Sequence, residues 1–259
     1  MSPRPISQGL AATLGLRQMI IDGELAAGDR VSELVLAERL RVSRTPLRLA
    51  LAQLAHEGLL EVLSGGGFAV RSFTTQHVAD AIELRGVLEG TAARFAAERH
   101  VGQADLGELI GTVAQIDQLM KPGQPGIDDF GRYVELNEYF HNQLFVLAAS
   151  DVLRESYDRI LALPFASPSA FIAVEAELYA GGDDWLTVAQ HQHRDMVNAI
   201  DRGEGARAET VAREHARLAR TNLDAALVHV DALTLVPGAR LIVIEDDDSG
   251  GAAAPPDPR

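Results

Sequence analysis

The chain has 259 residues, which is enough for two domains with hydrophobic cores, and it carries a formal net charge of −14. It contains no cysteine, which excludes disulfide bonds and thiolate metal sites and suits a reducing cytoplasm. Its first residues lack the apolar core of a secretory signal and no run approaches transmembrane length, so we expect a cytoplasmic protein that does not bind membranes.

Residues 32–54 (SELVLAERLRVSRTPLRLALAQL) predict two short amphipathic helices that meet at a tight turn, the pattern of a helix-turn-helix. Ser43 is a good N-cap for the second helix, and Pro46 falls in its first turn, where its missing N–H is not required. Such turns commonly carry a left-handed glycine. This chain has Arg41 there, for which a positive φ costs about 1–2 kcal/mol.

The second of these helices has an apolar face and a basic face. Apolar residues recur at helical spacing, which predicts a buried stripe of Leu47, Ala50, Leu51 and Leu54. Arg44, Thr45 and Arg48 lie away from this stripe, near the helix N-terminus, where a recognition helix meets base edges and phosphates. Two packed helices with solvated arginines would show part of the same pattern, and they are the alternative interpretation.

Residues 59–71 predict a strand, a glycine turn and a second strand directly after this helix. Such a hairpin is the wing of a winged helix, and its Gly65 and Gly66 would let backbone N–H groups approach a phosphate or the minor groove. Its tip has no Lys or Arg, so we expect it to add little to affinity. An ordinary flexible turn would also explain the glycines.

The acidic net charge does not belong to this N-terminal part. Residues 1–73 contain 8 arginines against 7 acidic residues, whereas the remainder contains 15 basic against 30 acidic residues. An acidic second domain repels DNA non-specifically and leaves contact to the recognition face. We therefore expect weak non-specific binding.

The segment from Leu16 to Val62 resembles the winged-helix domain of GntR-family bacterial transcription regulators. It contains, in the family's order, the motifs I-x-x-G-x-L-x-x-G-x-R-[LV]-S-E, S-R-T-P-[LV]-R and E-G-L-[LV]. The resemblance implies that the partner is double-stranded operator DNA and that a homodimer binds it. Leu34 stands where some relatives carry a further arginine. The family's DNA-contacting positions fall on Ser43, Arg44, Thr45, Arg48, Gly65 and Gly66.

From Thr75 onward the pattern is helical, with helices predicted over 75–99, 102–119, 127–149, 151–163, 183–202 and 205–232. Glycine-containing breaks fall at 121–123, 180–182 and 203–205. We therefore expect a mainly α protein with three parts. These are a winged helix-turn-helix domain over 1–73, an all-α bundle over 74–235 and a largely disordered tail over 236–259.

The spacing of histidines suggests a site inside the bundle. Asn137 and His141 lie four residues apart on one predicted helix and so share a face. His193 and His215 lie at equal offsets from the break at 203–205, so an antiparallel hairpin places both roughly 15 Å from the turn. The amide oxygen and three imidazoles could then converge on a divalent ion such as Zn²⁺ or Ni²⁺. A solitary buried histidine is more often a hydrogen-bonded core residue, so spacing alone leaves both interpretations open.

The pieces IELRGVLEGTAARFAA, LNEYFHNQLFVLAAS and QHRDMVNAIDRGEGARAETVAREH are similar to the FCD ligand-sensing domain of the FadR branch of GntR regulators. In many members one Asp or Asn and three His bind a metal ion. These positions fall on Asn137, His141, His193 and His215. Asn at the first position removes a carboxylate, which is expected to weaken metal affinity. His191 points elsewhere on its helix.

The charge of this site predicts the type of effector. Three neutral imidazoles and an amide leave a divalent ion uncompensated, so a small carboxylate entering the pocket would neutralise it. Arg85 matches the family arginine that often faces this pocket, which implies bidentate binding of an organic acid. A surface ion pair with Glu89 at i+4, worth only about 0.3–0.5 kcal/mol, is the competing interpretation.

These observations predict a transcriptional regulator, most simply a repressor, whose affinity for operator DNA is controlled by a small carboxylate at a metal site. A metal-free pocket for a larger acyl ligand is one alternative. A metal-dependent hydrolase is another, since an open metal site can activate water. For that role the candidate base is Glu214, which lies beside His215 and should point off the shared face. An all-α adaptor that never contacts DNA is the third.

Overall fold

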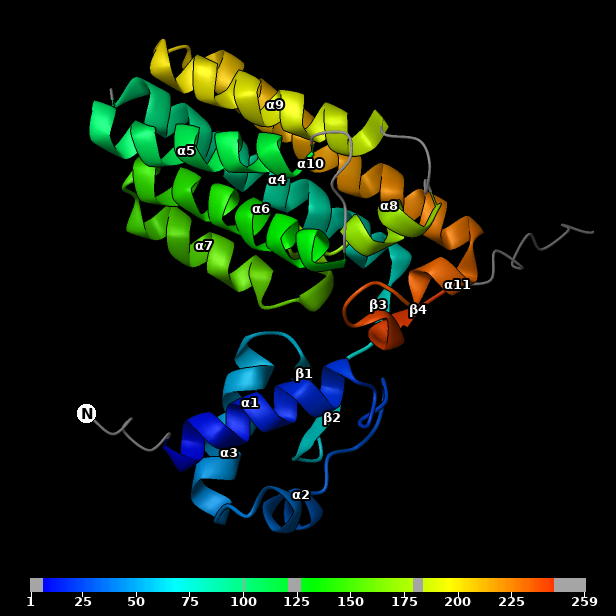
Figure 1. Cartoon of the computed structure of the whole chain (residues 1–259). Helices are drawn as coiled ribbons and strands as arrows, with labels where there is room; N and C mark the ends of the chain where they lie inside the picture. Colours follow the sequence, from blue (N-terminus) through cyan, green and yellow to red (C-terminus); the bar gives the residue numbers. More distant parts are fainter. Residues whose placement is uncertain (1–6, 100, 121–126, 179–183, 245–259) are drawn as a thin grey trace, which may run out of the picture.

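The computed structural model describes residues 7–99, 101–120, 127–178 and 184–244. They form a small N-terminal lobe and a larger helical lobe, joined by a short two-stranded segment (Figure 1). Most of these residues are helical, which confirms the mainly α prediction. None of the helices in these ranges combines the length and apolar character that a bilayer crossing requires.

The N-terminal lobe contains α1 (Gln8–Ile21), α2 (Glu33–Leu40), α3 (Arg44–His56), β1 (Leu60–Val62) and β2 (Phe68–Val70). Helix α1 packs along α3, and α2 contacts α3 at the end of the lobe furthest from the bundle (Figure 1). Leu16 and Ile20 of α1 are fully buried, and so is nearly the whole apolar stripe predicted for α3. The helix-turn-helix therefore has the predicted helices and the predicted buried face.

The turn between α2 and α3 contains a left-handed arginine. Arg41 ends α2 with φ 55° and ψ 41°. A side chain in this conformation costs about 1–2 kcal/mol, which glycine would avoid. The N–H of the next residue, Val42, donates to the Ala37 carbonyl at 3.1 Å, and its side chain packs against the core. These contacts hold the turn in the conformation that the motif needs.

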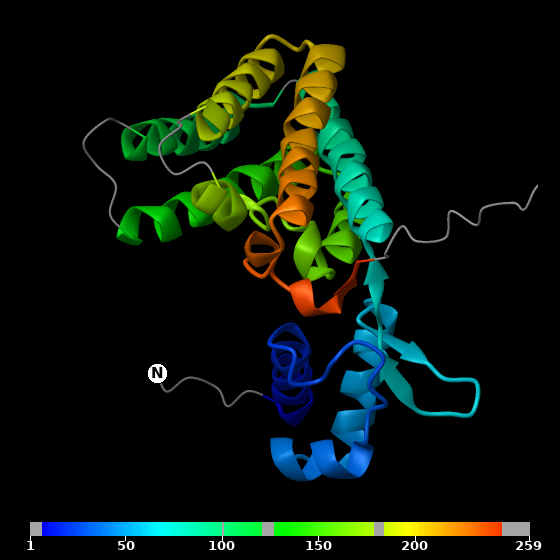
Figure 2. The ribbon, with the colours of Figure 1, turned by 90° about the vertical axis from the view of Figure 1, so that its right-hand side faces the viewer.

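The predicted wing is present. Strands β1 and β2 pair antiparallel, with Leu60 opposite Val70. The turn uses positive φ at Gly66 (83°) and Gly67 (88°), a conformation that glycine adopts at no steric cost. Of the two glycines predicted to matter, Gly65 does not need this freedom. The hairpin projects from the side of the lobe (Figure 2).

The helical lobe contains α4 (Thr75–Glu98), α5 (Gln103–Leu119), α6 (Ile127–Ala148), α7 (Asp151–Leu161), α8 (Ile172–Leu178), α9 (Asp184–Asp201), α10 (Gly205–Val228) and α11 (Val230–Leu233), with short 3₁₀ turns at Pro164–Ala166 and Ala239–Leu241. The predicted helices are present to within a few residues, the last being divided into α10 and α11, whereas α8 was not predicted. The predicted breaks at 121–123 and 180–182 both lie outside the described residues. At the third break, Gly203 has a φ of 70°.

Helix α4 is central to this lobe, because it contacts α6, α7, α9 and α10. Its approach to α10 is close because Gly86 and Gly90 face that helix. A Cβ on Gly86 would lie 2.7 Å from the Ala216 Cβ, and one on Gly90 would lie 2.9 Å from the Arg213 Cγ. The missing side chains let the two backbones approach, which brings the polar residues of α4 against α10.

The prediction that the tail begins at residue 236 is partly wrong. Val236 and Leu241 are buried, and β4 (Ile242–Val243) pairs in parallel with β3 (Phe73–Thr74), the strand that links the two lobes. This segment folds back onto the protein because Val236 and Leu241 join the hydrophobic core that also buries Phe73. Residues 245–259 lie outside the described residues.

Candidate DNA-binding surface and metal centre

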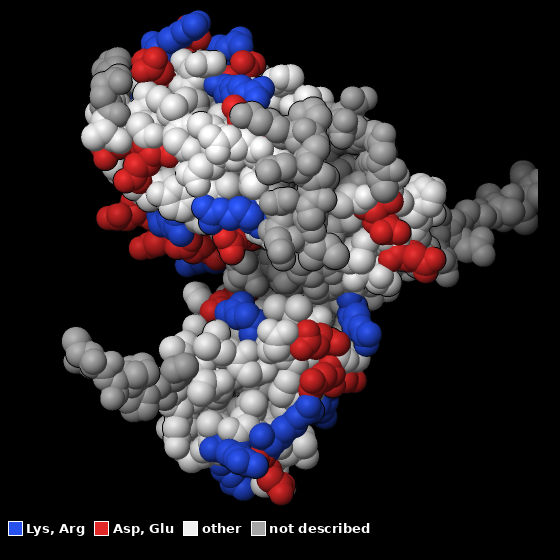
Figure 3. All heavy atoms as spheres, in the orientation of Figure 1, with Lys and Arg blue, Asp and Glu red and all other residues white. Residues whose placement is uncertain are grey.

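The exposed end of the N-terminal lobe carries the residues predicted to contact DNA. Ser43 precedes α3 in an extended conformation, but its side chain makes no cap hydrogen bond and stays exposed. Arg44 and Thr45 are exposed in the first turn, and Arg48 follows with its side chain 71% exposed and 3.1 Å from Glu33. Basic side chains gather at this end of the lobe (Figure 3). The arrangement fits a helix whose first turns enter a major groove.

The wing receives a positive charge from outside its own sequence. Arg30, in the segment before α2, forms an isolated antiparallel bridge with Ala69 of β2. Its Nη2 atom lies 3.8 Å from the position that a Cβ on Gly65 would occupy. The exposed guanidinium of Arg30 therefore lies beside the glycine turn. It gives the wing a positive charge that could contact a phosphate, although the tip of the hairpin itself has no Lys or Arg.

Three histidines from three helices meet inside the helical lobe. His141 comes from α6, His193 from α9 and His215 from α10, and all are buried. The Nε2 atom of His215 lies 3.1 Å from Nε2 of His193 and 3.2 Å from Nε2 of His141. One ring nitrogen of each lies within 4.8 Å of the others, so a single metal ion could contact all three. The hairpin of α9 and α10 accounts for the meeting of His193 and His215.

Two of the rings turn their outer nitrogen toward a glutamine oxygen. Nδ1 of His193 lies 3.0 Å from Oε1 of Gln190, and Nδ1 of His215 lies 3.1 Å from Oε1 of Gln192. Gln190 is fixed in this orientation because its amide nitrogen donates to a backbone carbonyl of α5 at 2.9 Å and to the Asp117 carboxylate. An oxygen acceptor at Nδ1 favours the tautomer with its proton on Nδ1 and a lone pair on Nε2.

The third ring faces a carboxylate. Nδ1 of His141 lies 3.1 Å from Oε1 of Glu89, although the ring N–H is not aligned well enough for a regular hydrogen bond. The contact is therefore a close charge–dipole interaction, which also favours a proton on Nδ1. With all three rings in this tautomer, three Nε2 lone pairs point at one another. They repel unless a cation lies between them, so the donor set fits a metal ion.

The protonation state of the buried rings suits metal binding. Burial lowers the pKa of His193 well below its ordinary value, and the neighbouring His141 adds to the effect. Burial likewise lowers the pKa of His215, with both other histidines contributing. Imidazole must be neutral to bind a metal, and low-dielectric surroundings disfavour the imidazolium form. Both rings are thus ready to donate a lone pair near neutral pH.

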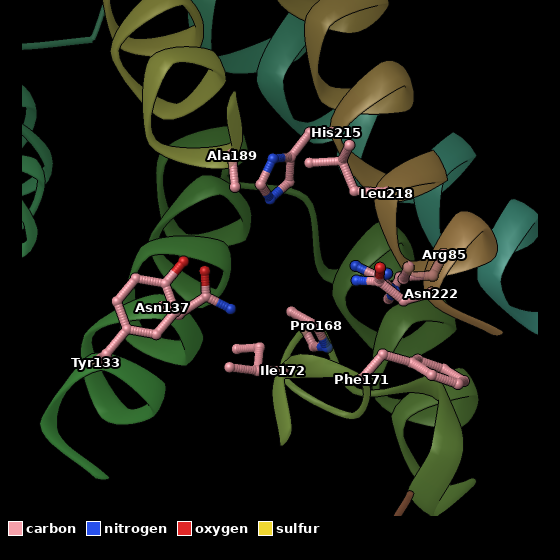
Figure 4. Close-up of a pocket in the computed structure, with 11 residues that line it drawn as sticks. Arg85, Tyr133, Asn137, Pro168, Phe171, Ile172, Ala189, His215, Leu218 and Asn222 are labelled. Atoms are coloured by element: carbon pink, nitrogen blue, oxygen red, sulfur yellow. The ribbon is translucent and has the colours of Figure 1, made fainter. Parts of the chain in front are cut away.

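A cavity of about 40 Å³ lies beside His215 (Figure 4). His215 and Asn137 project toward it from α10 and α6, and Arg85 and Asn222 approach it from another side. The Asn137 amide N–H donates to Oγ of Ser169 at 3.2 Å, so its carbonyl oxygen is the atom that could serve as a ligand. The apolar part of the wall consists of Pro168, Phe171, Ile172, Ala189, Leu218 and Ala219.

Arg85 and Glu89 form a buried ion pair, so the competing interpretation of a surface pair is wrong. Their side chains are 2% and 1% exposed, and Nη1 of Arg85 donates to both carboxylate oxygens at 3.1 Å. Nε of Arg85 is buried and has no hydrogen-bond partner among the residues that the structure describes. Because the Arg85 side chain also lines the cavity, its positive charge lies close to where an anion there would bind.

Glu89 is held as a carboxylate. Burial raises its pKa, but Arg85 and His141 outweigh burial and lower the pKa to about 2. The hydroxyl of Tyr157 on α7 donates to Oε1 of Glu89 at 3.2 Å. Burial and the charge of Glu89 raise the pKa of Tyr157 well above its ordinary value, so the hydroxyl keeps its proton. A carboxylate of such low pKa is a weak base and a poor activator of water.

Several residues around the histidines were missed from the sequence. Glu214, the glutamate beside His215, is exposed, and the carboxylate that contacts His141 is Glu89 from another helix. Gln190 lies three residues before a predicted ligand and so shares its helix face, which is a signal that could have found it. No such signal marks Tyr157, because α7 meets the site only in the folded protein.

Comparisons with known proteins agree with this architecture. Residues 10–70 match the family model described as bacterial regulatory proteins, gntR family, and residues 80–218 match the FCD domain. An uncharacterized HTH-type transcriptional regulator in an unstable DNA locus of Streptomyces ambofaciens is 32% identical over 248 residues, covering 89% of this chain and 93% of that protein. A probable D-xylose utilization operon transcriptional repressor of Paenarthrobacter nicotinovorans is 26% identical, covering 76% of this chain and 80% of its own length. The structure of E. coli McbR/YncC has the same fold, with a TM-score of 0.58 and 19% identity over 86% of this chain and 100% of its own.

The winged helix, its exposed arginines and these relatives define a DNA-binding transcriptional regulator. More closely, the chain belongs to the GntR family of bacterial regulators and carries a C-terminal FCD domain. The family and these relatives are regulators, not enzymes, which decides against a hydrolase. Operator DNA is the family's partner, which decides against an adaptor that never contacts DNA.

Proposed function

We propose that a small carboxylate controls this regulator by binding at a metal ion held by His141, His193 and His215, with Asn137 as a fourth ligand. The observation that carries the proposal is the convergence of three buried Nε2 atoms whose rings each face an oxygen at Nδ1. Ordinary core histidines satisfy their nitrogens separately, whereas here three Nε2 atoms face one another, an arrangement that a cation between them would stabilise. A bound ion such as Zn²⁺ or Ni²⁺ would supply Lewis-acid positions that a carboxylate can occupy.

Charge favours an anionic effector. A divalent ion and the Arg85 guanidinium together exceed the single negative charge of Glu89, so the centre would keep a net positive charge. The guanidinium of Arg85, whose side chain lines the cavity, would give a carboxylate a charge-assisted hydrogen bond there. The side chains of Tyr133 and Asn222 also line the cavity and can orient the rest of a polar acid.

The size of the cavity favours a small acid. A volume of about 40 Å³ is the space of a few water molecules. A volume of this size matches an acid of a few carbon atoms better than a long acyl chain. This observation favours the carboxylate proposal over the metal-free pocket for a larger acyl ligand.

The fold offers a route from the cavity to the DNA-binding lobe. Helix α4 begins directly after β3, and α10 leads through α11 to β4, the partner of β3. Arg240, just before β4, packs against Gly23 at the end of α1. A shift of α4 against α10 would therefore move the winged helix. In a homodimer, such a shift changes the spacing of the two recognition helices and hence operator affinity.

The sign of the response that we propose is relief of repression. One relative is named as a repressor, which supports this choice. The acid can act only if it binds the two arrangements of the lobes with different affinities. It must therefore bind more weakly to the operator-bound form than to the free form.

The test measures operator affinity by fluorescence anisotropy, with a duplex selected by the wild-type protein, against a panel of small carboxylates. The variant is Arg85→Lys, which keeps the charge beside Glu89 but loses the guanidinium fork. Arg94→Lys on the same helix, whose pairs with Glu98 and Glu209 lie outside the cavity, is the matched control. We expect an acid that weakens operator binding of wild type and control about tenfold and affects Arg85→Lys much less. An equal response of all three proteins would contradict the role of Arg85.

A further inference from the structure

Glu89 stands between the histidine centre and the arginine of the cavity. Its Oε1 atom is within 3.1 Å of Nδ1 of His141, accepts from Nη1 of Arg85 at 3.1 Å, and accepts from the Tyr157 hydroxyl at 3.2 Å. The side chain is 1% exposed. One buried carboxylate oxygen therefore contacts groups on α4, α6 and α7 at once.

We propose that Glu89 is a positioning residue that orients His141 for metal binding and holds Arg85 at the cavity. The metal site and the anion site would then share one carboxylate. The inference rests on the proposed function and adds to it the residue that joins the metal to the anion site.

Two contacts of Glu89 carry different parts of this role. A carboxylate at Nδ1 fixes the tautomer of a metal-ligating histidine, makes it a stronger donor and directs its Nε2 lone pair. His141 is the only one of the three histidines with an anion at this position, since His193 and His215 face glutamine oxygens. The negative charge that attracts a cation to the histidines is therefore that of Glu89, at the outer side of His141.

The contact with Arg85 links this effect to the effector. Nη1 of Arg85 donates to both oxygens of Glu89, and the same side chain lines the cavity. An acid that takes part of the guanidinium charge loosens its hold on Glu89 and leaves more of the carboxylate charge to His141. Binding of the acid and binding of the metal should then strengthen each other, because they are reciprocal by linkage.

A change at Tyr157 perturbs the position of the same Glu89 oxygen without removing its charge. The Tyr157 hydroxyl lies on α7, outside the proposed ligand set, and donates only to Glu89 among its hydrogen bonds to described residues. Loss of this bond leaves the charge of Glu89 in place but frees the oxygen to turn away from His141. The expected effect is smaller than the loss of the charge itself.

The experiment uses the full-length protein and zinc as the metal probe. Zinc affinity is measured by competition with a chromogenic chelator for wild type, Glu89→Gln and Tyr157→Phe. Glu83→Gln is the matched control, because Glu83 is an exposed carboxylate on the same helix that pairs with Arg213 and Arg217. We expect Glu89→Gln to lose about 10–100-fold in zinc affinity, Tyr157→Phe to lose less, and Glu83→Gln to match wild type.

A spectroscopic measurement separates positioning from packing. In metal-free protein, nitrogen-15 NMR of the imidazoles reports the tautomer of His141, which we expect to be protonated at Nδ1 in wild type and mixed in Glu89→Gln. Circular dichroism confirms folding, and Tyr157→Phe serves as the test if Glu89→Gln does not fold. Wild-type zinc affinity and tautomer that persist in the folded variants would overturn the role of Glu89. Failure of the wild type to bind zinc would instead overturn the proposed function. In that case the tautomer of His141 in metal-free protein would still test its contact with Glu89.

Discussion

The two candidate functional regions of this regulator are built in opposite ways. The predicted recognition face consists of exposed side chains at the start of one helix, and Arg48 there pairs with Glu33 while staying 71% exposed. The histidine centre consists of buried side chains from five helices, connected by contacts of about 3 Å. An exposed face can lose a residue without disturbing its neighbours. In the centre, the loss of one group leaves others buried without a partner.

The largest expected effect comes from removing a central ligand. His193→Ala deletes one of the three converging nitrogens, and we expect zinc affinity to fall by at least about 100-fold. His191→Ala, two residues away on the same helix and exposed, is the control. The metal content after dialysis against zinc, measured by inductively coupled plasma mass spectrometry, checks the difference. Equal zinc in the two variants would break the assignment of the centre.

Metal removal should cost stability, because the centre is part of the core. A metal present at about 100 times its dissociation constant stabilises the folded state by about 2.7 kcal/mol. For a chain of this size, that corresponds to roughly 5–10 °C in melting temperature. Thermal denaturation with and without a chelator measures it. His193→Ala should show no such change, and a chelator effect of equal size in that variant would contradict the prediction.

At the other end of the molecule, Arg44→Ala should lower operator affinity by roughly 10–100-fold, or about 1–3 kcal/mol. Arg48→Ala should lose less, because Glu33 already engages that side chain at 3.1 Å. Anisotropy titrations measure affinity, and melting curves should stay unchanged since both residues are exposed. Arg154→Ala on α7, a partly exposed arginine of the other lobe that pairs with Asp158, should bind as wild type does. A large loss of stability in Arg44→Ala would show that this side chain supports the fold, and it would contradict the view that the exposed face tolerates such changes.

The smallest expected effect is a gain. Asn137→Asp adds a carboxylate at the proposed fourth ligand and should tighten zinc binding about tenfold. Asn142→Asp is the matched control, since Asn142 lies on the same helix and donates to the Glu138 carbonyl. Chelator competition reads the affinity of both variants. Zinc binding that is the same in both would place Asn137 outside the ligand set.

The contrast also explains how much could be predicted from the sequence. The helix-turn-helix was predictable because its cap, proline, apolar stripe and arginines lie within one contiguous segment. The α9–α10 hairpin was predictable because equal offsets from one turn place His193 and His215 at one height. Local periodicity and turn chemistry determine both features.

What escaped prediction depends on contacts between distant helices. Glu89 looked like a partner for a surface arginine, because its spacing from Arg85 is the same whether the pair is exposed or buried. Burial of this pair results from the close approach of α4 to α10 at Gly86, which sequence spacing does not reveal. The strand pairing of the C-terminal segment was missed for the same reason. Two residues in a parallel ladder carry too weak a pattern to identify their partner.

The central claim is that the buried histidine centre controls the exposed DNA-binding end. Its most direct test is an operator titration of zinc-loaded and metal-free protein, side by side, across small carboxylates. We predict that at least one acid weakens operator binding of the zinc-loaded protein about tenfold and leaves the metal-free protein nearly unaffected. The same response in both forms, or no response to any acid, would contradict the account.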